Sequence, residues 1–94
     1  MTMDVYGQMA TKIIQAQEVI IGPVAVEQAK RIPNLRIDWD KKDVNIKGSG
    51  EAAINDLVAV YERLFGKISQ EVSKEAAAPF INKLPVDSLP QSLK

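Results

Sequence analysis

The chain has neither cysteine nor histidine, and its 12 acidic and 12 basic residues cancel over 94 positions. Without cysteine it can form no disulfide and no thiolate site, and without histidine it lacks the commonest imidazole base and transition-metal ligand. The charge balance produces no long-range field that would attract nucleic acid or an anionic membrane. We therefore expect no cofactor and no metal, and nucleic acid is a disfavoured partner.

Long apolar runs are also missing, because stretches such as 19–21 fall far short of the roughly 20 apolar residues that span a bilayer. The first residues do not show the basic and then apolar pattern of a secretory signal. These features predict a cytoplasmic protein with no membrane association. Hydrophobic residues nevertheless make up 46% of the chain, enough for the core of one small domain.

Two helical patterns occupy the first third of the sequence. Over 2–21, apolar residues recur three and four positions apart, which indicates an amphipathic helix with Thr2 as its N-cap and Asp4 in its first turn. Gly22 and Pro23 interrupt it, because proline disfavours helical geometry in the preceding residue but suits the start of a helix. A second helix over 23–32 follows. One kinked helix over 3–32 is the alternative that this pattern leaves open.

The next segment alternates apolar and polar residues, which is typical of strands with one buried face. Two such runs, 35–40 and 43–47, predict an antiparallel β-hairpin. Pairing Trp39 with Val44, and Ile37 with Ile46, places every apolar side chain on one face. Because two lysines suit a two-residue turn poorly, we expect a four-residue loop over 40–43.

A third helical pattern starts after Ser49, which is a suitable N-cap, and its apolar stripe continues to Phe80. It predicts one long C-terminal helix of about 28 residues that ends near Pro79 and would kink at Gly66. The tail, 82–94, contains two Leu-Pro pairs and no helical period, so we expect it to be extended. The predicted fold is thus a single α+β domain over 1–81, followed by a proline-containing extended tail over 82–94.

A first candidate binding site lies between the hairpin and the long helix, at Gly48, Ser49 and Gly50. Backbone N–H groups at a helix N-terminus can bind an anion such as phosphate. The segment lacks the remaining positions of a phosphate-binding loop, and Glu51 places a negative charge beside it. A turn with an N-cap is the simpler interpretation.

Two further charged clusters are candidates. Acidic residues gather at the hairpin tip, but their spacing does not match a calcium loop and two lysines neutralise them: Asp38, Asp40 and Asp43. A modest basic cluster flanks Pro33 and would contact nucleic-acid phosphates without reading sequence: Lys30, Arg31 and Arg36. No serine has a histidine to activate it, so we expect no catalytic residue and no enzyme activity.

The apolar faces predict an interface between chains. A two-stranded sheet must pack on helices, which leaves part of the first helix and the second half of the long helix without an evident partner. We expect a small oligomerisation or adaptor module, a homodimer formed by apolar helix faces and hairpin edges. A protein partner could also bind the long helix or the C-terminal tail. The predicted interface residues are Met9, Ile13, Ile20, Ile68, Val72 and Phe80.

Two functions of other classes remain alternatives. One is a dimeric nucleic-acid-binding regulator that uses the basic cluster together with Lys41 and Lys42, and its affinity for nucleic acid would fall steeply with salt. The other is a small ligand- or anion-sensing domain that uses Gly48, Ser49 and Gly50, which a stabilising ligand would reveal.

Overall fold

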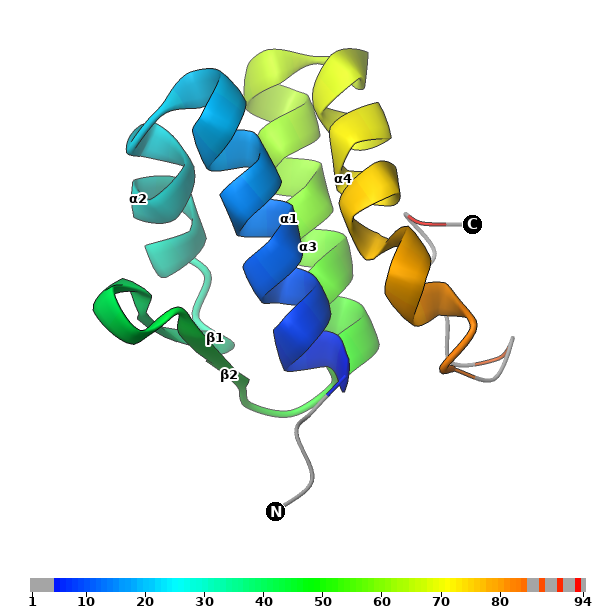
Figure 1. The fold of residues 1–94 in the computed structure, drawn as a ribbon. Helices are drawn as coiled ribbons and strands as arrows, with labels where there is room; N and C mark the ends of the chain where they lie inside the picture. The colour runs from blue at the N-terminus through cyan, green and yellow to red at the C-terminus, as the bar shows by residue number, and fades with distance from the viewer. Residues whose placement is uncertain (1–4, 85–86, 88–89, 91–92, 94) are drawn as a thin grey trace.

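A computed structural model describes residues 5–84, 87, 90 and 93, and over these residues the protein has the expected α+β class (Figure 1). The elements follow in the order α1 (Val5–Ile21), α2 (Val24–Lys30), β1 (Leu35–Asp38), a short 3-10 helix η1 (Trp39–Lys41), β2 (Asp43–Ile46), α3 (Gly50–Phe65) and α4 (Lys67–Ile81). Helices α1, α3 and α4 pack on one another, and α2 and the hairpin lie on the opposite side of α1 from α4 (Figure 1). Thr2 and Asp4, the expected N-cap and first-turn residues, lie outside the described residues.

The first two helices are separate, which excludes the single kinked helix over 3–32. Helix α1 ends where Gly22 takes a φ of 75° and donates its N–H to the Glu18 carbonyl at 2.8 Å. Few residues other than glycine adopt a positive φ readily. Pro23 then stands at the N-cap position of α2, where its missing N–H costs nothing.

The hairpin is confirmed, but its expected register is wrong by two residues. Ile37 pairs with Val44 and Leu35 pairs with Ile46, so a shift of two leaves the same side chains on the apolar face. The loop has four residues, 39–42, and begins one position earlier than expected because Trp39 leaves the strand for the 3-10 turn. Lys42 closes the loop with a φ of 51°.

The expected long C-terminal helix is two helices, α3 and α4, which turn back on each other at Gly66. Gly66 has a φ of 83° and its N–H bonds to the Glu62 carbonyl at 2.8 Å, which ends α3. A glycine can take this conformation without steric cost, and the chain therefore reverses rather than kinks. Helix α4 then packs along α1 and α3 (Figure 1).

Reversal also changes which face of α4 is buried. The expected stripe runs through Ile68, Val72 and Phe80. Of these only Phe80 is buried, and the other buried residues lie one position after the stripe, at Ser69, Ser73 and Ala77. Three of the four buried side chains of α4 are small, so the contact between α4 and α1 buries few methyl groups of α4. This packing hides the face of α1 that the sequence left without a partner.

The core draws on every helix and both strands, and it also includes Leu93 near the end of the chain. Pro90 is fully buried and Leu93 is 6% exposed. At these two positions, the predicted tail packs against the domain. The other described tail residues are 82–84 and 87, and the rest of the segment 82–94 lies outside the described residues.

Gly50, at the start of α3, packs so closely against the Tyr6 ring that a larger residue should be destabilising. A Cβ atom at this position would overlap the ring of Tyr6. Overpacking of this kind costs about 1–3 kcal/mol, and the higher helix propensity of alanine returns up to about 1 kcal/mol. We therefore expect Gly50→Ala to lower the free energy of unfolding by roughly 1 kcal/mol in urea denaturation.

The Tyr6→Ala background supplies the control for this prediction. With the ring removed, Gly50→Ala should be neutral or stabilising, because only the propensity gain remains. Equal destabilisation in both backgrounds would contradict the assigned contact.

Candidate functional site

The structure divides the predicted interface residues into two groups. Met9 and Ile13 are fully buried in α1, and Phe80 is 8% exposed in α4, so all three belong to the core of a single chain. Ile20 and Ile68 are exposed, at 55% and 69%, and Val72 is half-buried. The expectation that the second half of the C-terminal helix lacks a partner is corrected, because α1 and α3 cover it. Of the six predicted interface residues, only Ile20, Ile68 and part of Val72 are therefore available to another molecule.

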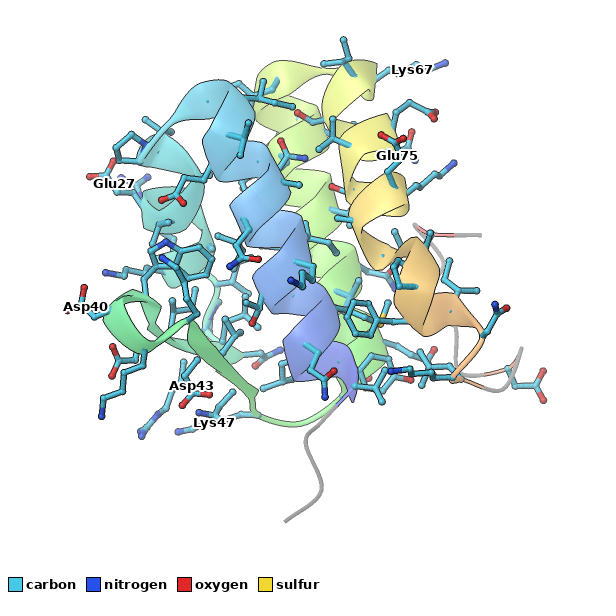
Figure 2. All side chains as sticks on the ribbon, in the orientation of Figure 1. Glu27, Asp40, Asp43, Lys47, Lys67 and Glu75 are labelled. Carbon is cyan, nitrogen blue, oxygen red and sulfur yellow. The ribbon has the colours of Figure 1, made fainter. Side chains whose placement is uncertain are left out.

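Exposed large hydrophobic side chains gather at one end of the helical bundle, which we call the apolar end. Its members come from the last turns of α1 and α3 and the first turns of α2 and α4, and they are Val19, Ile20, Val24, Leu64 and Ile68. The α1–α2 and α3–α4 connections lie together at this end (Figure 1). The side chain of Lys67 extends from the same end (Figure 2). Sequence reasoning named two of the five members and missed Val19, Val24 and Leu64.

A buried polar contact fixes the position of α1 against α4 and so places both helices at this end. The Gln17 side chain is fully buried, and its Nε2 group donates to the Ser69 carbonyl at 2.8 Å and to Ser73 Oγ at 3.1 Å. Within the described part of the chain, Gln17 Oε1 has no hydrogen-bond partner. Because hydrogen bonds have narrow geometry, sliding α4 by one turn would break both. The contact therefore fixes how far along the bundle Ile20 of α1 lies relative to Ile68 of α4.

A second polar cluster joins the hairpin to α1, and sequence reasoning missed it. Trp39 Nε1 donates to Glu18 Oε2 at 3.2 Å, and Lys42 Nζ lies 4.3 Å from the centre of the indole ring. The helical pattern of the sequence places Glu18 on the polar side of the first helix and indicates no further role for it. Its partner lies 21 positions away, so no short-range pattern could reveal the pair.

Tyr61 is fully buried in α3, and its hydroxyl donates to the Ala25 carbonyl at 2.6 Å. Burial raises the pKa of this phenol well above its ordinary value of 10.0, and the nearby Glu18 carboxylate raises it further. The hydroxyl therefore stays protonated, and it ties α2 to α3. Such a group serves as a structural donor at neutral pH rather than as a base.

The Gly48, Ser49 and Gly50 segment forms the turn and cap that the simpler interpretation predicts. Ser49 Oγ accepts a hydrogen bond from the Ala52 N–H at 3.2 Å, which confirms Ser49 as the N-cap of α3. Gly48 has a φ of 81°. The Tyr6 ring lies against Gly50, so this helix N-terminus is partly covered. Anion binding here stays a prediction.

The charged clusters lie on the surface without converging on a common point. Asp38, Asp40 and Asp43 are all exposed. The Asp40 side chain points away from the hairpin (Figure 2), whereas Asp43 Oδ2 accepts a hydrogen bond from Asn45 Nδ2 at 3.3 Å. Among residues 5–84 and the three described positions of the tail, no acidic group is arranged to hold a metal ion. The basic residues are exposed at the end of α2 and on β1: Lys30, Arg31 and Arg36. Arg31 also lines a cleft that is described below.

In comparisons with known proteins, no protein-family model, curated protein or solved structure matches the chain. In the described part of the chain, none of the helices combines the length and apolarity that crossing a bilayer would require.

Proposed function

We propose that the protein is a small non-enzymatic interaction module that forms a homodimer through its apolar end. The observation that carries the proposal is that the exposed side chains of Val19, Ile20, Leu64 and Ile68 all come from helix turns at the same end of the bundle. Core-type side chains at 47–87% exposure are costly to leave in water, because each would gain about 1–2 kcal/mol from complete burial. Their clustering is typical of surfaces that bind another protein.

The area of the apolar end suits a second copy of the chain. Its five side chains expose on the order of 500 Å² in total, near the upper limit of the largest apolar patch on a typical monomer. Two copies in contact through it would bury about 1,000 Å², which is close to the lower limit for a specific protein interface. An interface of this small area is typical of weak association, so we expect a dimer that forms only as the concentration of the chain rises.

Charge also favours self-association. The net charge of the chain is zero, so two copies do not repel each other at long range. Exposed charges of both signs occur in the adjoining turns of α3 and α4, at Glu62, Lys67 and Glu71. In a two-fold contact each copy presents the same patch, and a rim of mixed sign allows opposite charges to face each other across it.

The proposal is tested by sedimentation velocity over a range of low to high micromolar concentrations. We expect the wild-type chain to shift from monomer to dimer as its concentration rises. Ile68→Glu should remain monomeric throughout, because the dimer would bring two like charges together inside an apolar contact. Circular dichroism should show that the variant keeps its fold, since Ile68 is 69% exposed.

The matched control is Ala78→Glu, which adds the same charge to an exposed position near the other end of α4. It should dimerise as the wild type does. A wild-type chain that stays monomeric at every concentration, or an Ile68→Glu variant that dimerises normally, would refute the proposal.

A further inference from the structure

A separate cleft of about 360 Å³ opens between the C-terminal part of α2 and the outer face of α3. Arg31 at the C-cap of α2 and Arg63 in the last turn of α3 both line it. Asp56, two helical turns before Arg63, lines the same cleft. Its volume lies toward the lower limit of small-molecule sites, which have volumes of about 300–1,000 Å³.

The two guanidinium groups are exposed and have no ionic partner among the residues that the structure describes. No carboxylate among the described residues forms an ion pair with Arg31 or Arg63, and Asp56 is likewise unpaired. A guanidinium group presents several N–H donors in one plane, which matches the two oxygens of a carboxylate. Two such groups bordering one cleft form a recognition site for an anion.

Asp56 limits the charge of that anion. Two arginines and one aspartate give the cleft a net charge of plus one at neutral pH. A monoanion balances this charge, whereas a doubly charged phosphate would exceed it and lie near the Asp56 carboxylate. The composition of the cleft therefore favours a carboxylate over a phosphate.

The remaining lining is mostly apolar, with Gln28 of α2 as one further polar side chain. Ile32 is 4% exposed, Val60 is half-buried, and Pro33 contributes a rigid ring beside them. Ligand sites commonly combine an apolar wall with a few polar groups that fix orientation. An apolar body attached to the carboxylate would pack on this wall.

We propose that the cleft between α2 and α3 binds a small monocarboxylic acid with an apolar body, about the size of phenylpropionate. The carboxylate binds Arg31 and Arg63, and the apolar body contacts Ile32 and Val60. This site lies on α2 and α3 and does not depend on the dimer proposed for the apolar end.

The experiment is a titration of the full-length chain with 3-phenylpropionate, followed by two-dimensional NMR of the backbone amides. We expect saturable shifts at Ile32, Val60 and Arg63. The alcohol 3-phenylpropanol, which has the same apolar body without the charge, should produce no saturable shift at these residues. Inorganic phosphate should bind more weakly than the acid.

Three variants assign the contacts. Arg31→Gln and Arg63→Gln should each weaken binding about tenfold, since each removes a charge-assisted hydrogen bond. Arg36→Gln removes an exposed arginine of β1 that does not line the cleft, and it should leave affinity unchanged. Asp56→Asn should strengthen binding severalfold, because the nearby negative charge is removed.

The outcomes that would overturn the inference are distinct. No saturable shift with phenylpropionate at millimolar concentration would exclude the site. Equal binding of the alcohol would show that the arginines play no part, and tighter binding of phosphate would contradict the assignment to carboxylates. Equal loss of affinity in Arg36→Gln would point to a general effect of charge.

Discussion

Replacing Ile13 with alanine is expected to lower the free energy of unfolding by about 2–5 kcal/mol, whereas the same replacement at Ile68 should change it by less than about 0.5 kcal/mol. The two residues have the same side chain, and the apolar periodicity of the sequence assigns both to one interface. Ile13 is fully buried in the core and Ile68 is 69% exposed. Truncating Ile13 removes buried methyl groups and leaves a cavity, and neither cost applies at Ile68.

Urea denaturation followed by circular dichroism measures both changes. The chain should be kept at low micromolar concentration, so that dissociation of a dimer does not contribute to the free energy. A small domain has only about 5–15 kcal/mol of stability, so the Ile13 variant should lose a large fraction of it. Similar losses for the two variants would contradict the packing of α4 against α1, because Ile68 would then have to be buried.

Stability should also fall above pH 10, and the buried hydroxyl of Tyr61 should account for part of the loss. Burial raises the pKa of Tyr61 above its ordinary value of 10.0. Between pH 10 and the folded-state pKa, the unfolded chain releases this proton and the native chain retains it. The native state then binds more protons, so its free energy of unfolding decreases by about 1.4 kcal/mol per pH unit.

Tyr61→Phe isolates this contribution, because every other charged group is present in both proteins. At pH 8 the variant should be less stable by about 1–2 kcal/mol, since it loses the hydrogen bond to the Ala25 carbonyl. Above pH 10 the advantage of the wild type should shrink as pH rises. Urea denaturation at pH 8, 9, 10 and 11 tests this, and parallel stability curves for the two proteins would contradict it.

The local elements follow directly from the sequence, because their signals lie within a few residues of one another. Ser49 caps α3 and Gly22 ends α1, and the alternation on either side of Trp39 produces the hairpin. The hairpin register was predicted wrongly because Trp39 lies in the loop rather than in the strand. There its indole donates a hydrogen bond to Glu18 of α1, which is distant in the sequence. A contact of this kind has no signature in the local pattern.

The C-terminal half of the fold shows a different limit. A helical stripe that continues through Gly66 predicts one helix, and only the φ of 83° at Gly66 turns it into two. The reversal of the chain buries the polar residues Ser69 and Ser73 and exposes the apolar residue Ile68. This is the opposite of what the hydrophobicity of the three side chains predicts. The Gln17 amide, 52 and 56 positions away in the sequence, donates to the backbone carbonyl of Ser69 and to the hydroxyl of Ser73.

The candidate sites were predictable only in part for the same reason. Ile20 and Ile68 carried a signal as members of apolar stripes, but the apolar end exists only after α4 folds back beside α1. The cleft brings together Arg31 and Arg63, which are 32 positions apart, through the packing of α2 on α3. In the sequence Arg31 carried a signal only as part of the basic cluster with Lys30 and Arg36, and Arg63 carried none.

The single tryptophan of the chain gives the molecule a built-in optical reporter. Its indole is held between the Glu18 carboxylate of α1 and the Lys42 ammonium of the loop, so emission from this one fluorophore reads the docking of the hairpin on the helices. Detachment of the hairpin would place the indole in water and shift that emission to longer wavelength, while the helical signal in circular dichroism stayed unchanged. Comparing the two signals during unfolding therefore distinguishes loss of the hairpin from collapse of the helical bundle.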